Sequence, residues 1–129
     1  MYNFAVIGSN FVTDWLIEAS RGVESVRLAA VYSRTEERGR AYAALHGAER
    51  VYTELSSLAR DPEIDFVYIA SPNLCHAPQA IELLRAGKSV LCEKPIAPDL
   101  AALDAMCGAA RESGCVLMEA MVSAHLPCW

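Results

Sequence analysis

The sequence contains no apolar run long enough to cross a membrane. Nowhere in its 129 residues are there the roughly 18 consecutive apolar residues that a membrane-spanning helix needs. The opening segment, MYNFAVIG, has no basic residue of the kind that begins a secretory signal. We therefore expect no membrane partner and a cytoplasmic location.

The cysteines lack the spacing of a metal site or of a disulfide framework. The sequence has 5 of them, an odd number, and no two form a Cys-X-X-Cys pair. We expect free thiols that pack as small apolar side chains in a reducing compartment, and no bound metal. The cysteines are Cys75, Cys92, Cys107, Cys115 and Cys128.

Positive charge is scarce. The 11 Lys and Arg residues are outnumbered by 16 Asp and Glu, which gives a formal net charge of −5. Domains whose main role is to hold nucleic acid usually carry a basic surface, so we expect no nucleic-acid partner. A local basic pocket for a phosphate group remains compatible with this charge. With 53% hydrophobic residues, the chain is able to bury a core of its own.

What the sequence does contain is a regular alternation of short apolar runs and longer amphipathic segments. Strands that are apolar on both faces, separated by helices, imply a parallel sheet covered on two sides. We predict a doubly wound α/β domain, the Rossmann fold, as a single domain over residues 1–129. The predicted strands are 4–7, 26–32, 51–52, 65–70, 89–92 and 115–118, and the predicted helices are 11–21, 36–46, 54–59, 77–86 and 100–112. In such folds ligands bind at the carboxyl ends of the strands.

The first predicted strand ends in a glycine turn, GSNFVT, that keeps only part of the GxGxxG pattern of dinucleotide-binding sites. Gly8 permits the tight turn, Asn10 takes the place of the second glycine, and Thr13 takes the place of the third. Asparagine tolerates the left-handed backbone region better than most residues. We predict that the amides of the next helix face a pyrophosphate; an ordinary strand–helix turn is the alternative. The candidate contacts are Gly8, Ser9, Asn10, Phe11 and Val12.

The second predicted strand is followed by Ser33 and Arg34, at about the spacing where NAD sites place an acid for the ribose 2′-hydroxyl. Arg38 lies one helical turn beyond Arg34, on the same face. A serine and arginines at this point predict a site for the 2′-phosphate of NADP, and we expect NADP in preference to NAD. The alternative is that Thr35 caps the following helix and that the arginines are solvated.

Two further motifs follow the fourth and fifth predicted strands. The first is Ser71-Pro72-Asn73-x-x-His76, and the second is the segment AGKSVLCEKP, which ends in Glu93-Lys94-Pro95. Together they closely resemble the Gfo/Idh/MocA family of NAD(P)-dependent oxidoreductases, and the resemblance extends from residue 4 to about residue 127. It implies a cofactor-binding domain of an enzyme that acts on the CH–OH group of a sugar, a polyol or a related carbonyl compound.

The resemblance also implies roles for these residues. In that family, residues that match Ser71, Pro72, Asn73 and His76 line the nicotinamide and its ribose. Glu93 and Lys94 belong to the cofactor site as well, and Lys94 contacts the reacting oxygen of the substrate. Hydride transfer at a carbinol carbon requires a proton to move too, and a partly buried lysine at the end of a strand is suited to supply it. The alternatives are a surface lysine and a histidine that only begins a helix.

Members of the family carry a second, larger domain that forms the substrate pocket and the oligomer interface. This sequence stops at Trp129, so we expect a cofactor domain truncated at its C-terminal end, with apolar surface left exposed. Three functions are compatible with these residues. The chain is an oxidoreductase by descent, a catalytically inactive dinucleotide-binding module or remnant, or one half of an enzyme that a partner chain completes.

Overall fold

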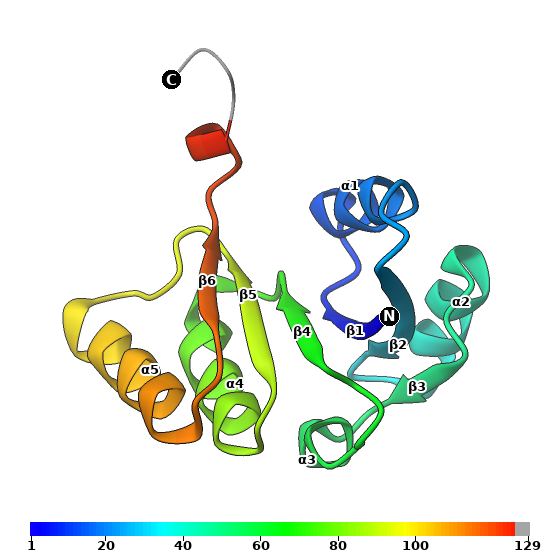
Figure 1. Cartoon of the computed structure of the whole chain (residues 1–129). Helices are drawn as coiled ribbons and strands as arrows, with labels where there is room; N and C mark the ends of the chain where they lie inside the picture. Colours follow the sequence, from blue (N-terminus) through cyan, green and yellow to red (C-terminus); the bar gives the residue numbers. More distant parts are fainter. Residues whose placement is uncertain (126–129) are drawn as a thin grey trace.

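The computed structural model describes residues 1–125 and confirms the predicted parallel α/β architecture (Figure 1). The strands are β1 (Tyr2–Ile7), β2 (Val26–Tyr32), β3 (Arg50–Tyr52), β4 (Phe66–Ile69), β5 (Ser89–Glu93) and β6 (Leu117–Ala120). The helices are α1 (Phe11–Ser20), α2 (Glu36–His46), α3 (Leu55–Ala59), α4 (Asn73–Arg85) and α5 (Leu100–Ser113), followed by a short 3-10 turn, η1 (Val122–His125). Cys128 lies outside the described residues.

The strand order is β3-β2-β1-β4-β5-β6, and every neighbouring pair is parallel. The chain therefore runs outward from β1 in one direction, returns to the centre, and runs outward again from β4. At the point between β1 and β4, the loops at the carboxyl ends diverge to opposite faces of the sheet. Doubly wound folds bind their ligands at this point.

Two apolar layers hold the helices to the sheet. On β1, Ala5 and Ile7 face one layer, which also receives side chains of α3, α4 and α5. Phe4 and Val6 face the other layer, which receives side chains of α1 and α2. This strict alternation is the period of two expected for a strand that is buried on both faces. Figure 1 shows α4 and α5 beside β5 and β6, whereas α1 and α2 lie toward the β2 end of the sheet.

Several predicted boundaries were wrong, among them the start of β1, which lies two residues earlier than predicted, and the starts of α4 and β6. Helix α4 begins at Asn73 instead of residue 77, because Pro72 already occupies the cap position and the chain turns within residues 71–72. Pro78 lies inside this helix without ending it. Strand β6 begins two residues later than predicted, since Gly114 closes α5 in the left-handed conformation and the next two residues lead into the sheet.

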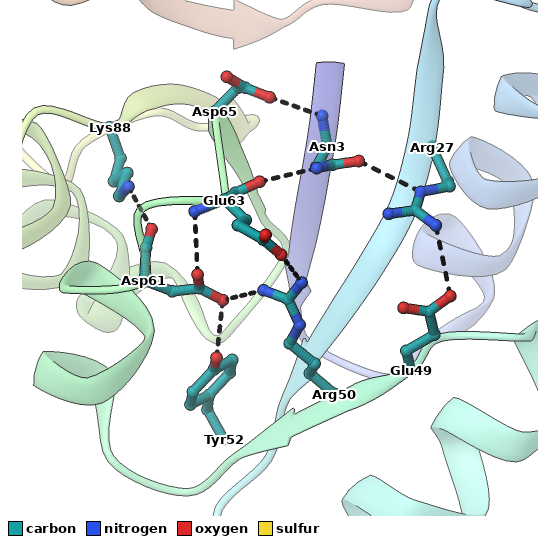
Figure 2. A network of polar contacts seen from close by, with 9 residues as sticks. All are labelled: Asn3, Arg27, Glu49, Arg50, Tyr52, Asp61, Glu63, Asp65 and Lys88. Atoms are coloured by element: carbon teal, nitrogen blue, oxygen red, sulfur yellow. Dashed lines mark hydrogen bonds and ion pairs between the residues drawn. The ribbon is translucent and has the colours of Figure 1, made fainter. Parts of the chain in front are cut away.

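Polar side chains tie together the amino ends of the strands, at the edge opposite to the ligand-binding edge (Figure 2). The carboxylate of Asp61 accepts hydrogen bonds from Arg50 at 2.5 Å and from the Tyr52 hydroxyl at 2.7 Å. Lys88, which is 8% exposed, donates to the carbonyl oxygens of Asp61 and Ile64 at 2.5 and 2.8 Å. These contacts fix the loop between α3 and β4 and belong to the stability of the fold.

We expect Asp61→Asn to lower the free energy of unfolding at neutral pH by about 1–3 kcal/mol, because it removes a charged partner from Arg50. Burial raises the pKa of Asp61, but hydrogen bonds from the Glu63 amide, Tyr52 and Arg50 outweigh it, so the net shift is downward. A carboxyl group with a lowered pKa in the folded state stabilises the protein above its unfolded pKa of about 3.9, and that contribution disappears as the pH falls through the folded pKa.

Urea unfolding between pH 7 and pH 2 measures this effect. The variant should lose less stability than the wild type below about pH 4. Glu49→Gln is the control: its carboxylate pairs with Arg27 at 3.3 Å, and both side chains are about half exposed or more, at 64% and 46%. A surface pair of this kind contributes little. If the free energy of unfolding fell equally with pH in the wild type and in Asp61→Asn, this account would be contradicted.

Over β4, β5 and β6, the face of the sheet opposite α4 and α5 has no helix over it in the part of the chain that the structure describes. Phe66, Leu91 and Met118 face away from α4 and α5, and a hollow of about 480 Å³ opens above them. Met118 is 53% exposed. The apolar surface expected from the sequence is therefore present over β4, β5 and β6. Within residues 1–125, no helix has the length and apolar character that a membrane crossing requires.

Candidate functional site

A cleft of about 500 Å³ lies at the carboxyl ends of β1, β2 and β4, at the point where the strand order reverses. It collects residues from three segments that are far apart in the sequence. Its lining residues are Ile7, Gly8, Ser9, Asn10, Tyr32, Ser33, Arg34, Arg38, Ala70, Ser71, Pro72, Cys75 and Gln79. Most of the residues predicted from the first turn and the second strand thus lie together. Phe11, Val12, Asn73, His76, Glu93 and Lys94 are outside this lining.

Gly8 has the backbone geometry that the first turn requires. Its φ angle is +106°, and a Cβ atom at this position would lie 2.4 Å from the carbonyl oxygen of Ala70. Real Cβ atoms do not approach backbone so closely, and L side chains rarely adopt this φ. The turn after β1 therefore passes against the end of β4 only because residue 8 is glycine.

Asn10 has a different role from the one predicted. Its φ angle is −109°, so it does not occupy the left-handed region. Its side-chain oxygen instead accepts hydrogen bonds from the amides of Val12 and Thr13, at 3.0 and 3.3 Å, and caps α1. Its side-chain nitrogen donates to the carbonyl oxygen of Ala70 at 2.8 Å. The Asn10 side chain therefore joins the start of α1 to the end of β4. A glycine at residue 10 would have no side chain to make these contacts.

This cap changes which amides are available to an anion. The Val12 amide, predicted to face a pyrophosphate, already donates to Asn10. The amides of Ser9, Asn10 and Phe11 donate no hydrogen bond within residues 1–125. Three successive free N–H groups in a turn before a helix form a suitable anion-binding surface. Thr13 is fully buried against the sheet, as a small residue at the third position should be.

The end of β2 brings positive charge to the cleft. Arg34 and Arg38 line it, and neither forms an ion pair with any residue in the range 1–125. Thr35 stands at the cap position of α2, but its side chain makes no capping hydrogen bond, contrary to the alternative considered above. Glu36, in the same first turn, pairs with Arg40 at 2.5 Å. This acid is therefore neutralised by a neighbour outside the cleft lining.

Sequence reasoning missed two polar residues of the cleft. Cys75 and Gln79 lie one turn apart on α4 and both line it. The side-chain oxygen of Gln79 accepts a hydrogen bond from the Ser71 hydroxyl at 2.6 Å. The spacing of four between them is a signal for one helix face. The predicted helix begins only at residue 77, so it does not include Cys75.

His76 does not line the cleft. It is 1% exposed, and both ring nitrogens contact backbone carbonyl oxygens: Nε2 lies 2.8 Å from that of Ser71, and Nδ1 lies 3.0 Å from that of Pro95. A neutral imidazole donates through one nitrogen only, whereas the doubly protonated ring donates through both. The ring is thus packed between two loops.

Lys94 follows β5 directly, at the carboxyl edge of the sheet, as predicted. Its side chain is exposed rather than partly buried. The neighbouring Glu93 accepts a hydrogen bond from the Tyr68 hydroxyl at 2.7 Å, and burial together with this carboxylate raises the pKa of Tyr68 far above its ordinary value. The Lys94–Pro95 peptide bond is cis. On either side of Lys94, the Glu93 carboxylate and the Pro95 carbonyl oxygen each make a contact with a side chain of another element, whereas the Lys94 side chain extends into solvent.

The cysteines of the described region offer neither a reactive nor a metal-binding cluster. Burial, followed by the nearby Glu93 and Glu119 carboxylates, raises the pKa of Cys92 to about 12, so its thiol stays protonated at neutral pH. Cys75, Cys92, Cys107 and Cys115 are all free thiols. Within residues 1–125, no group of three or more His, Cys, Asp or Glu side chains is arranged to hold a metal ion.

A doubly wound sheet with a glycine turn, free amides and a cleft at its switch point is typical of a dinucleotide-binding domain. Residues 2–121 match the oxidoreductase family with an NAD-binding Rossmann fold that is named Gfo/Idh/MocA. The chain belongs to this family. The resemblance drawn from the Ser-Pro-Asn and Glu-Lys-Pro motifs is thereby confirmed.

Individual relatives agree with this assignment. The chain is 44% identical over 127 residues to the scyllo-inositol 2-dehydrogenase (NADP(+)) IolU of Bacillus subtilis, covering 98% of this chain and 39% of that protein. An NAD binding oxidoreductase from Klebsiella pneumoniae superposes with a TM-score of 0.92 at 32% identity, over 98% of this chain and 36% of that one. KijD10, a 3-ketoreductase from Actinomadura kijaniata solved with TDP-benzene and NADP, gives 0.90 at 30% identity, over 98% and 40%. The chain thus spans well under half the length of these proteins.

Proposed function

We propose that this chain binds NADP in preference to NAD, as the cofactor half of an oxidoreductase acting on the CH–OH group of a sugar, a polyol or a related carbonyl compound. The observation that carries the cofactor preference is the cleft wall at the end of β2. Ser33, Arg34 and Arg38 line it, and no acid stands among its lining residues. NAD sites place a carboxylate at this point for the ribose 2′-hydroxyl.

The residues present fit a dinucleotide. Gly8 brings the turn against Ala70 with no side chain in between. The free amides of Ser9, Asn10 and Phe11 follow it and are suited to the pyrophosphate. On the far side of the same cleft, Ser71 and Pro72 provide the wall that the nicotinamide ribose would use.

The two arginines are suited to a 2′-phosphate because neither has a competing partner. A guanidinium group binds phosphate oxygens through paired, charge-assisted hydrogen bonds. Arg34, just before α2, and Arg38, in its first turn, are both exposed and line the same wall of the cleft. Two acids, Glu36 and Glu37, stand between them in the sequence, and Glu36 is paired with Arg40. An added phosphate therefore meets two cations that have no ion-pair partner within residues 1–125, whereas both acids lie outside the cleft lining.

We expect Arg34→Ala to weaken NADP binding by roughly tenfold or more and to leave NAD binding nearly unchanged. The reason is that a hydrogen bond to a charged group contributes about 1.5–3 kcal/mol, and only NADP carries the 2′-phosphate. Isothermal titration calorimetry with both cofactors measures the effect. Arg60→Ala is the matched control, since Arg60 is exposed, forms no ion pair within residues 1–125 and lies outside the cleft lining. An equal loss for NADP and NAD would overturn the role of Arg34.

Lys94 is the catalytic candidate. When bound, the nicotinamide supplies or accepts the hydride of the reaction. Lys94 would hold and move the proton at the substrate oxygen, since it stands at the carboxyl edge of the sheet with an exposed ε-amino group. The substrate class rests on the family and on relatives such as the scyllo-inositol dehydrogenase. The alternative, a dinucleotide-binding module without catalysis, makes the same cofactor contacts and differs only in turnover.

A further inference from the structure

A buried histidine connects the two loops that flank the proposed nicotinamide end of the cleft. His76, on the first turns of α4, contacts the carbonyl oxygen of Ser71 through Nε2 and that of Pro95 through Nδ1, at 2.8 and 3.0 Å. Ser71 belongs to the turn after β4, which lines the cleft. Pro95 follows Lys94 directly in the loop after β5. One side chain thus links the wall of the cofactor cleft to the loop of the proposed catalytic lysine.

The ring has no capacity left for a ligand. It is 1% exposed and lies outside the cleft lining, and each nitrogen already faces a carbonyl oxygen. A nicotinamide amide or ribose hydroxyl would need a free ring nitrogen at the cleft surface. The geometry therefore separates His76 from the residues suited to direct cofactor contact.

We infer that His76 is a positioning residue, which fixes the Lys94 loop relative to the turn at Ser71. This inference rests on the proposed function of the cleft and of Lys94. The ε-amino group of Lys94 is exposed and hangs on a loop, so its distance from a bound cofactor depends on how that loop is held. Catalytic groups need support of this kind, because small displacements cost large factors in rate.

The Lys94 loop is held at three points, and the histidine has a distinct place among them. Tyr68, on β4, holds the carboxylate of Glu93, and Glu119, on β6, accepts the amide of Ile96 at 3.0 Å. These two contacts tie the loop to its own sheet. The contact with His76 ties it to the cleft wall as well, through Ser71. Removing the ring should therefore loosen the loop and the turn together.

Three substitutions separate the two contacts. In His76→Asn the side-chain amide nitrogen takes about the place of Nδ1, and in His76→Gln it takes about the place of Nε2. His76→Asn should thus keep the contact with Pro95, and His76→Gln should keep the contact with Ser71. His76→Leu keeps the apolar bulk and removes both. Lys88→Met is the stability control, because it removes a buried polar contact at the opposite edge of the sheet.

Hydrogen exchange of the protein without cofactor measures the coupling. In His76→Leu we expect the amides of Ile96, which donates to Glu119, and of Cys75, which donates to the carbonyl oxygen of Pro72 at 2.7 Å, to exchange at least tenfold faster, with little change in α5. His76→Asn should restore the protection of Ile96, and His76→Gln should restore that of Cys75. Unchanged exchange at Ile96 in His76→Leu, or a uniform increase like that of Lys88→Met, would overturn the inference.

Ligand binding adds a second readout that distinguishes this inference from the proposed function. In the proposed site, adenosine 2′,5′-bisphosphate would occupy the Arg34 end of the cleft and the first turn, whereas NADPH would extend further, to Ser71. His76→Leu should leave affinity for the bisphosphate unchanged and weaken NADPH binding several-fold. A wild type that binds neither ligand contradicts the proposed function. Equal losses for both ligands in His76→Leu contradict the positioning role.

Discussion

In a form of the protein that carries a substrate domain, Lys94→Ala is expected to lower kcat by about 10²–10⁴-fold, the usual contribution of a positioned acid or base. Its melting temperature should stay nearly unchanged. The second expectation follows from the structure, because the Lys94 side chain is exposed and takes part in no side-chain hydrogen bond or ion pair within residues 1–125. Initial rates and calorimetric melting test the two halves separately.

The isolated chain allows an additional test of where Lys94 lies. The sequence contains two lysines, and the other, Lys88, is buried between two carbonyl oxygens. An amine-acylating reagent should therefore label Lys94 and the N-terminus first, and saturating NADPH should slow the labelling of Lys94 alone. Turnover that survives Lys94→Ala, or a collapse of the fold in that variant, would contradict the assignment.

The second large effect is expected from Gly8→Ala, which should abolish measurable dinucleotide binding. The new Cβ atom would lie 2.4 Å from the carbonyl oxygen of Ala70, at a φ of +106°. The turn must then move away from β4, which also breaks the hydrogen bond between Asn10 and Ala70. An unfavourable backbone conformation alone costs of order 1–3 kcal/mol, so stability should fall as well.

Gly47→Ala is the control variant that separates the effect of backbone strain from the effect of disrupting the binding cleft. Gly47 has a φ of +80°, and a Cβ atom there meets nothing within 4 Å. This variant should lose stability through backbone strain and keep its affinity for NADPH, as measured by fluorescence titration beside thermal unfolding. Full NADPH affinity in Gly8→Ala would show that the close approach at Ala70 is not needed for binding.

Local patterns were sufficient to predict the fold. The apolar runs around Val6 and Tyr68 alternate with amphipathic helices, and each of these signals depends on neighbouring residues alone. The start of α4 was predicted four residues too late, and Pro78 lies inside this helix, where the tertiary structure accommodates it. Propensity is a weak prior in such a case, since packing overrides it.

The candidate site was predictable only in part. Gly8, Ser33 and Arg34 follow strand ends, and the topology alone brings strand ends together. The roles of Asn10 and His76 depend on partners 60 and 19 residues away, at Ala70 and Pro95. No local pattern encodes such contacts. The side chains are polar in the sequence, but only the packed structure decides which of their atoms remain free.

The most direct test of the account is a pair of calorimetric titrations of the purified chain, one with NADP and one with NAD. The proposed site predicts binding of both, with NADP tighter by tenfold or more, because Arg34 and Arg38 meet only the cofactor that carries a 2′-phosphate. Tighter binding of NAD, or no binding of either cofactor at millimolar concentration, would contradict it.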